Sequence, residues 1–200
     1  GYARYFSYLG LFTFAMLSLV SADNSLQFFF GWEAVGFVSY LLIGFWFQRK
    51  AASQAALKAF LMNRAGDIGL LLGLILLIVH TGAQDFSTIF KAIPSLSPVH
   101  LRLFGYSFSL LNVIGVLLFI GAISKSAQIP LQVWLPDSMV GPTPVSALMH
   151  AATMVTAGVY MVARLAPVFE QAPAARSLIL IIGSTTALLL GIVAIIQTDI

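Results

Sequence analysis

Five ionisable residues interrupt the most apolar stretches of this 200-residue chain. They are Glu33 in GWEAVG, Arg64 and Asp67 in MNRAGD, Lys125 in ISKSAQ and His150 in LMHAAT. A charge in apolar surroundings is costly, so such residues are functional candidates by default. An imidazole is also the natural relay between groups that titrate on either side of it. These five residues are therefore the candidates for an ion or proton route.

The two acidic residues each have a plainer interpretation as well. Glu33 lies about 10 Å into its apolar segment by helical rise, and it could be a hydrogen-bonded residue near an interface beside Trp32. A glutamate cannot reach back to the interface as lysine can, which weakens this interpretation. Arg64 and Asp67 are spaced i, i+3, so they share a helix face and can pair. That pair could be only structural, and both interpretations stay open.

Lys125 and His150 have alternatives of the same kind. Lys125 could extend its side chain to the far interface. Its neighbours Ser124 and Ser126, together with the helix-breaking Pro130, favour a solvated internal site instead. His150 could be a hydrogen-bonded core histidine rather than a relay.

The composition places most of this chain in lipid. It is 60% hydrophobic and 8% charged, and its mean hydropathy is +0.97, whereas soluble domains are about 25% charged. The net charge of +3 without a basic stripe gives no indication of nucleic-acid binding. The absence of cysteine excludes disulfides and thiolate clusters, and three scattered histidines make a metal site unexpected.

Six apolar segments are long enough to cross a bilayer as helices, since a crossing needs about 20 residues. Their predicted bounds are 6–22, 26–47, 57–79, 104–135, 145–165 and 178–196. The fourth is too long for one crossing, and Pro130 removes a helix hydrogen bond. We predict two helices joined by irregular backbone between about 123 and 130. Irregular backbone at membrane depth is tolerated only inside protein or beside a water-filled cavity.

Three long motifs carry a family resemblance. They are GWEAVGFVSYLLIGFW, KAFLMNRAGDIGLLLG and SKSAQIPLQVWLPDSMVGPTPVSALMHAATMVTAGVYMVAR. They resemble the antiporter-like membrane subunits of respiratory complex I, the NADH–quinone oxidoreductase, and among these the subunit L family, called subunit 5 in mitochondria. The resemblance covers nearly the whole chain.

The resemblance implies an all-α, polytopic transmembrane bundle of about six helices, one of them broken, within an inverted-repeat antiporter-like fold. Because the chain opens on Gly1 without a signal-peptide pattern, we expect residues 1–200 to be an internal fragment of a longer membrane protein. By resemblance it holds most of the first inverted repeat and the first helix of the second.

The resemblance also assigns roles by position. Lys125 matches the family's central proton-carrying lysine at a helix break, and Glu33 matches its motif glutamate. His150 matches the relay histidine, and Asp67 with Arg64 matches a supporting acidic site near Glu33. Two residues depart from the family pattern: Ser124 stands where glycine is common. Val140 stands where glutamate is common, which removes a charge near the membrane surface.

The activity that the resemblance implies is proton translocation through a central axis of buried Glu, Lys and His, driven by redox chemistry in partner subunits. No cofactor is expected in this chain, and NADH, flavin, iron–sulfur clusters and quinone are expected in the partners. The expected surroundings are other membrane subunits of complex I, the lipid bilayer, protons and water, and no nucleic acid. The expected location is the bacterial inner (plasma) membrane as a multi-pass protein, with the mitochondrial inner membrane as the alternative.

The expected mechanism is electrostatic. An ion pair between Glu33 and Lys125 favours the protonated lysine, and separation of the two favours release of the proton toward His150.

Two alternative functions stay open. The large subunit of a multisubunit sodium/proton antiporter, or a hydrogenase-linked relative, shares the motifs around Lys125 and 142–147. Gly31-Trp32-Glu33 and Thr156, where antiporter relatives often carry lysine, favour complex I. A structural membrane subunit that transports nothing would instead use Glu33, Lys125 and His150 only as packing residues.

Overall fold

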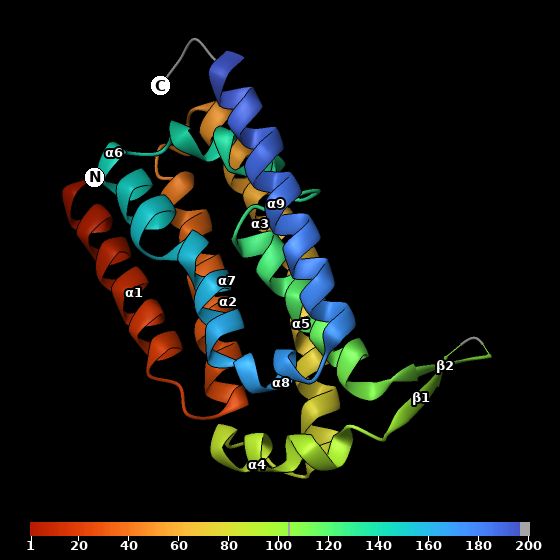
Figure 1. Cartoon of the computed structure of the whole chain (residues 1–200). Coiled ribbons are helices and arrows are strands. Elements are labelled where there is room, and N and C mark those ends of the chain that lie inside the picture. Colours follow the sequence, from red (N-terminus) through yellow and green to blue (C-terminus); the bar gives the residue numbers. More distant parts are fainter. Residues whose placement is uncertain (104, 197–200) are drawn as a thin grey trace.

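The chain folds into a bundle of long helices that run alternately in opposite directions (Figure 1). The computed structural model describes residues 1–103 and 105–196, without the side chains of Leu103 and Ala152. The bundle consists of α1 (Tyr2–Val20), α2 (Ser25–Ile43), α3 (Lys50–Thr81), α5 (Leu110–Lys125), the interrupted segment from α6 (Thr143–Ser146) to α7 (Met154–Arg164), and α9 (Pro173–Ile196). Within the described residues, five of these segments are long and apolar enough to cross a membrane, and α5 is shorter. The predicted transmembrane helical bundle is confirmed.

Local chemistry fixes where the central helices begin and end. The side chain of Asn24 accepts a hydrogen bond from the Gln27 amide at 2.8 Å and so caps the start of α2. At the other end of the pair, α3 stops at Gly82, whose φ of +67° is left-handed and favours glycine.

Close packing of α3 against α5 forms the centre of the bundle, and the most extensive helix contacts are between these two. Glycines on α3 make this approach possible. A Cβ on Gly69 would lie 2.8 Å from the Cβ of Ile120, and one on Gly73 would lie 2.9 Å from Leu118. Because glycine has no side chain, these positions let the two helix backbones approach closely.

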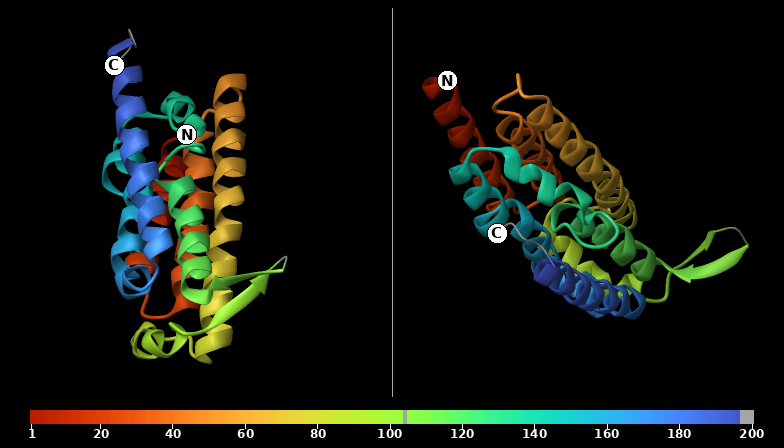
Figure 2. Two further views of the ribbon diagram at one scale, coloured as in Figure 1. Left: turned by 45° about the vertical axis from the view of Figure 1, so that its right-hand side comes forward. Right: turned by 90° about the horizontal axis from the view of Figure 1, so that it is seen from above.

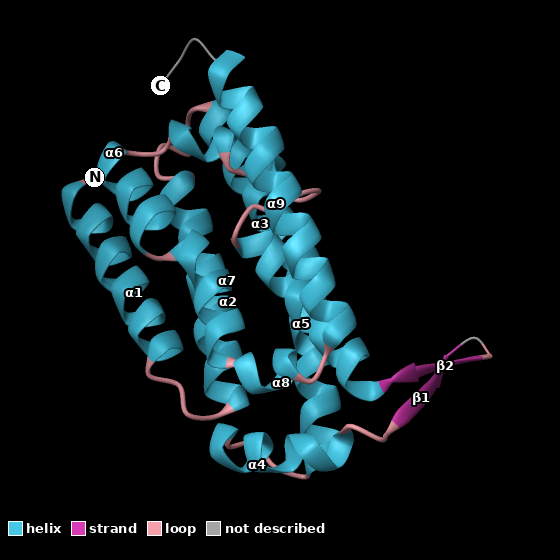
Figure 3. Cartoon of the chain, viewed as in Figure 1, coloured by secondary structure: helices cyan, strands magenta, loops and turns pink. Residues whose placement is uncertain are grey.

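One end of the bundle is covered by α4 (Phe86–Leu96), while a hairpin of β1 (His100–Leu103) and β2 (Tyr106–Ser109) projects sideways beside it (Figures 2 and 3). The strands are antiparallel, with His100 opposite Ser109 and Leu103 opposite Tyr106. This hairpin is a small exception to the predicted all-α fold. Apolar and polar residues alternate in both strands, and that period suits a strand rather than a helix.

The prediction for the fourth segment, residues 104–135, is right about the break but wrong about a second helix beyond it. Its first residue lies outside the described residues. Helix α5 continues through Lys125, and irregular backbone occupies 126–131. Short 3-10 turns come next, at Gln132–Trp134 and Pro136–Val140, in place of an α-helix. Pro130 and Pro136 explain this, because each removes a backbone donor that a helix would use.

Other predicted helix bounds also need correction, and the fifth predicted helix is interrupted. Helix α3 begins at Lys50 rather than near 57, since alanines that favour helices fill its first turns and Ala52, Ala55 and Ala56 are buried. Helix α9 begins at Pro173, where proline suits a first helical turn. The fifth crossing contains a π-helical stretch, Ala147–Ala152, before α7 starts. Such stretches are frequent at functional sites, and this one holds His150.

Candidate functional site

Four charged side chains of alternating sign form a row across three helices. Glu33 on α2 contacts Arg64 on α3 as an ion pair. Arg64 Nη1 lies 3.8 Å from Asp67 Oδ2 on the same helix face, and Lys125 Nζ on α5 lies 3.8 Å from the same Asp67 oxygen. The row therefore runs Glu33, Arg64, Asp67, Lys125, with no net charge when all four groups are ionised.

The row lies at the boundary between two apolar cores. One core includes Phe28, Leu77 and Phe86 toward the α4 end, and the other includes Phe12, Leu42 and Met149 toward the opposite end. The boundary falls between Trp32 and Val35 on α2, between Ala59 and Leu70 on α3, and between Ile123 of α5 and Ala127 just beyond its end. Asp67 and Lys125, the buried members of the row, are thus held inside the bundle between apolar layers.

Lys125 is the most enclosed member of the row. Its side chain is fully buried, and its Nζ lies 5.6 Å from the centre of the Trp32 ring. Among the described residues, neither Lys125 Nζ nor Asp67 Oδ2 has a hydrogen-bond partner. The other oxygen of Asp67 accepts a hydrogen bond of 2.6 Å from Trp32 Nε1, so the carboxylate is oriented with one oxygen toward the lysine.

Glycines leave the space that the end of α5 occupies. A Cβ on Gly36 would contact Lys125 Nζ, and a Cβ on Gly66 would contact the Ser124 hydroxyl. The lysine therefore depends on the absence of a side chain at Gly36 of α2.

The Glu33 end of the row reaches the surface of the bundle. Glu33 and Arg64 side chains are 24% and 31% exposed, whereas Asp67 is 4% exposed. A cavity of ≈ 380 Å³ opens there, lined by Phe29, Glu33, Arg64, Asp67, Ile68 and Leu71. Asp67 thus borders this cavity on one side and Lys125 on the other.

His150 lies on the other side of the helix break. Its Nε2 is 3.0 Å from the Ser138 hydroxyl, and its ring centre is 6.2 Å from that of Trp134. Trp134 is buried, and its Nε1 donates to the Ser124 carbonyl at 2.9 Å, next to Lys125. The described contacts therefore link His150 to the lysine's helix end through Trp134.

The geometry confirms one prediction about these residues and corrects another. Arg64 and Asp67 are in ion-pair reach on one helix face, as the spacing predicts, and they lie near Glu33, as the resemblance implies. The expected ion pair of Glu33 with Lys125 is wrong. Glu33 pairs with Arg64 instead, and among the described residues the carboxylate in ion-pair reach of Lys125 is that of Asp67.

Sequence reasoning missed three residues that organise the site: Trp32, Trp134 and Ser138. A signal for the tryptophans was available, because a buried indole N–H usually finds an acceptor and both residues sit in apolar segments. Nothing in the spacing of Ser138 indicates its contact with His150. Among the described residues, no group of three His, Asp or Glu side chains could hold a metal ion.

Comparison with known proteins finds relatives of this chain. The family described as NADH:quinone oxidoreductase/Mrp antiporter, TM, matches residues 22–200. NADH-quinone oxidoreductase subunit L of Neisseria meningitidis serogroup A is 54% identical over the whole chain, and that of Rhodobacter capsulatus is 52% identical over 99% of it. NADH-ubiquinone oxidoreductase chain 5 of Dictyostelium citrinum is 49% identical over 98% of the chain. The chain spans about 30% of the length of each of these relatives.

Two solved structures share the fold. A chain of the Mrp complex from Dietzia sp. DQ12-45-1b matches with a TM-score of 0.80 and 36% identity, over 93% of this chain and 19% of that one. A chain of the archaeal membrane-bound sulfane sulfur reductase matches with a TM-score of 0.65 over 79% of this chain and 24% of that one, at 22% identity. The second likeness concerns the fold alone.

Proposed function

Because the chain belongs to the NADH:quinone oxidoreductase/Mrp antiporter transmembrane family, we propose that it is the proton-carrying part of a subunit L type membrane subunit of NADH–quinone oxidoreductase. In this proposal residues 1–200 hold most of the first inverted repeat and the first helix of the second. The observation that carries the proposal is the buried Lys125 ammonium, which faces an oriented carboxylate oxygen of Asp67 and has no hydrogen-bond partner among the described residues.

Lys125 suits the role of proton carrier because its surroundings support both protonation states. Asp67 at 3.8 Å stabilises the ammonium, by about 4 kcal/mol at an effective dielectric constant near 20. The apolar layers above and below favour the neutral amine. Moving one charge against a membrane potential costs about 2.3 kcal/mol per 100 mV. The energy gained or lost when Lys125 makes or breaks its contact with Asp67 is therefore large enough to drive binding and release of a proton at the lysine.

Arg64 is the group that can control this contact. It lies between the carboxylates of Glu33 and Asp67, and it now pairs more closely with Glu33. In this arrangement the negative charge of Asp67 stabilises the protonated form of Lys125. If Arg64 moves toward Asp67, its guanidinium compensates the negative charge of that carboxylate. Asp67 then stabilises the Lys125 ammonium less, which favours release of the proton from Lys125. The proton then passes toward His150 along the side of the helix break that Trp134 and Ser138 line.

The proposed context rests on the named relatives. Subunit L and chain 5 are the names of proteins that match nearly the whole chain at about half identity. We place NADH oxidation and quinone reduction, with flavin and iron–sulfur clusters, in partner subunits, and other membrane subunits of complex I, lipid and water around this chain. The multi-pass location is the bacterial inner membrane, with the mitochondrial inner membrane as the alternative.

The test is proton translocation by the complete enzyme in membrane vesicles. Lys125→Met keeps the volume of the stem and removes the charge. The variant is expected to assemble and to translocate protons at a strongly reduced rate. Lys58→Met is the matched control, because Lys58 is an exposed lysine that is not part of the row and pairs with Asp137 at 2.6 Å, and exposed pairs contribute little. Normal translocation by an assembled Lys125→Met enzyme would support a structural subunit instead.

A second candidate is supported by the Dietzia match at 36% identity. In that case the chain is part of the large subunit of an Mrp-type sodium/proton antiporter. Sodium-dependent proton movement in vesicles without NADH would favour this candidate. The higher identity to subunit L favours the oxidoreductase.

A further inference from the structure

The irregular stretch after Lys125 leaves one backbone amide without a local partner. Residues 126, 127 and 128 donate to carbonyls of the last turns of α5, namely Ala122, Ser124 and Ile123. Leu131 donates back to the Gln128 carbonyl at 2.7 Å, and Pro130 has no N–H. Among residues 126–131, the Ile129 amide is therefore the backbone donor that needs an acceptor from another segment of the chain.

That segment is α9. Ile129 N–H donates to Thr186 Oγ1 at 3.2 Å, a contact between residues 57 positions apart in sequence. The Thr186 hydroxyl donates in turn to the Ile182 carbonyl at 2.6 Å within its own helix, which fixes its lone pair toward Ile129. Thr186 is 7% exposed, although most of α9 faces outward.

The rest of the helix end is already held on other sides. The Ser126 hydroxyl donates to the Val155 carbonyl of α7 at 2.7 Å, and Trp134 donates to the Ser124 carbonyl. A Cβ on Gly158 of α7 would contact the Ser126 hydroxyl. Thr186 supplies the remaining contact, on the α9 side.

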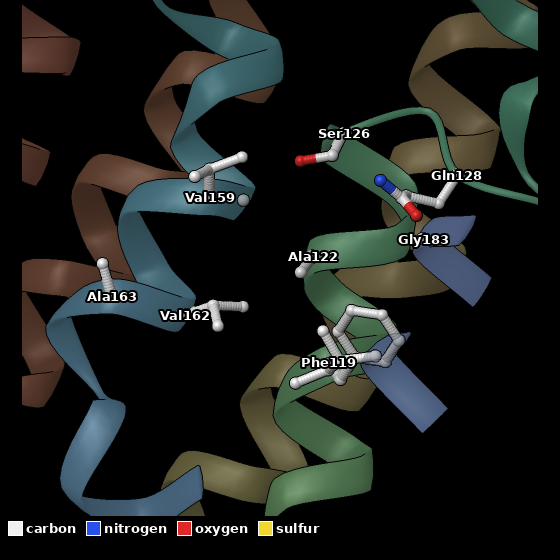
Figure 4. A pocket seen from close by; sticks show the side chains of 10 residues that line it. Phe119, Ala122, Ser126, Gln128, Val159, Val162, Ala163 and Gly183 are labelled. Atoms are coloured by element: carbon white, nitrogen blue, oxygen red, sulfur yellow. The ribbon is translucent and has the colours of Figure 1, made fainter. Parts of the chain in front are cut away.

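The break also has room to move. A cavity of ≈ 300 Å³ lies among α5, α7 and α9 beside the break, with Ser126 and Gln128 at its edge, Gly183 beside Gln128, and Val159 across from Ser126 (Figure 4). Loss of the Thr186 contact could therefore be relieved by a shift of residues 126–131, which would carry the adjoining Lys125 with it.

We infer that Thr186 is a positioning residue for proton transfer at Lys125, acting by fixing the helix break from α9 through the Ile129 amide. The inference rests on the proposed function. It adds a connection, since α9 is the helix that leads into the remainder of a longer chain in the proposal. Through Thr186, movement of α9 would change the position of the lysine.

The test compares Thr186→Val, which keeps the shape without the hydroxyl, with Thr186→Ser, which keeps the hydroxyl. Both are made in the full-length protein within the complete enzyme. A buried donor left unpaired corresponds to about a tenfold change or more, so protons moved per NADH oxidised should fall by about tenfold in Thr186→Val. Thr186→Ser should restore them. Hydrogen exchange at residues 126–131 should rise in the Val variant and return to the original level in the Ser variant.

The matched control is Thr185→Val, the same change one residue earlier. The Thr185 hydroxyl is exposed and bonds only the Ile181 and Ile182 carbonyls of its own helix among the described residues. It should leave both readouts unchanged. If Thr186→Val and Thr185→Val translocate protons equally well while Lys125→Met does not, the role of Thr186 is overturned and the proposed function stands. Normal translocation by Lys125→Met would overturn the proposed function itself.

Discussion

Adding one methyl group at Gly36 should impair proton transfer without weakening the bundle. In the structure a Cβ at this position would contact the Lys125 ammonium, with Arg64 Nη2 3.7 Å away and Lys125 Cε 3.9 Å away. The atom in the way is the tip of a flexible side chain. The ammonium would therefore withdraw from α2 while the helices stay in place.

The size of the effect can be worked out from the distances. Nonbonded heavy atoms settle about 3.5 Å apart, so the ammonium must withdraw by about 1 Å. Added to its 3.8 Å separation from Asp67, this reduces the attraction from about 4.4 to about 3.5 kcal/mol at an effective dielectric constant of 20. That energy difference alone corresponds to about a fivefold change in an equilibrium constant, and a 1 Å misplacement of reacting groups can lower a rate by about a hundredfold. Proton translocation by Gly36→Ala should therefore decrease by between about fivefold and about a hundredfold.

The assay is protons moved per NADH oxidised in vesicles, together with the thermal stability of the purified complex. Alanine favours a helix over glycine by about 0.5–1 kcal/mol, so stability should not fall. Gly10→Ala on α1 is the control, because a Cβ there meets no described atom within 4 Å. Equal translocation by the Gly36 and Gly10 variants would refute the placement of the ammonium against α2.

Three further substitutions test the elements that hold the site. Asn24→Ala removes the cap of α2 and should lower the stability of the complex by about 1 kcal/mol; an unchanged melting temperature would contradict the cap. Gly82→Ala places a side chain at φ +67° and should cost about 1 kcal/mol, measured in the same way against the Gly10→Ala variant. Gly66→Ala would force Ser124 and the Ile120 carbonyl away from α3 and should cost about 1–3 kcal/mol, seen as a lower yield of assembled complex.

The sequence predicts the membrane bundle because apolar length alone determines it. Arg64 with Asp67 could also be predicted, since a spacing of three residues fixes a shared helix face. Which carboxylate faces Lys125 could not. Glu33, Asp67 and Lys125 come from three helices, and their distances depend on helix rotation and on glycines such as Gly36 that permit close approach. Periodicity along one helix carries no information about rotation against another.

The end of α5 shows the same limit. Pro130 indicates a break, but the position of the last helical residue depends on contacts from distant segments, such as Trp134 with the Ser124 carbonyl and Thr186 with the Ile129 amide. The hairpin at 100–109 could not be predicted for a different reason. Each of its strands is only four residues long, and an alternation that short is a weak signal within a long connection between apolar helices.

The central claim is that Lys125 carries the proton and does not serve merely as a fixed charge. The most direct measurement is proton translocation by the Lys125→Arg enzyme in vesicles, with assembly verified on the purified complex. Guanidinium keeps the positive charge opposite Asp67 but does not release its proton at accessible pH. We therefore expect an assembled enzyme that oxidises NADH with little or no proton translocation. Full translocation by Lys125→Arg would show that the position needs only a positive charge, and it would contradict the role of Lys125 as proton carrier.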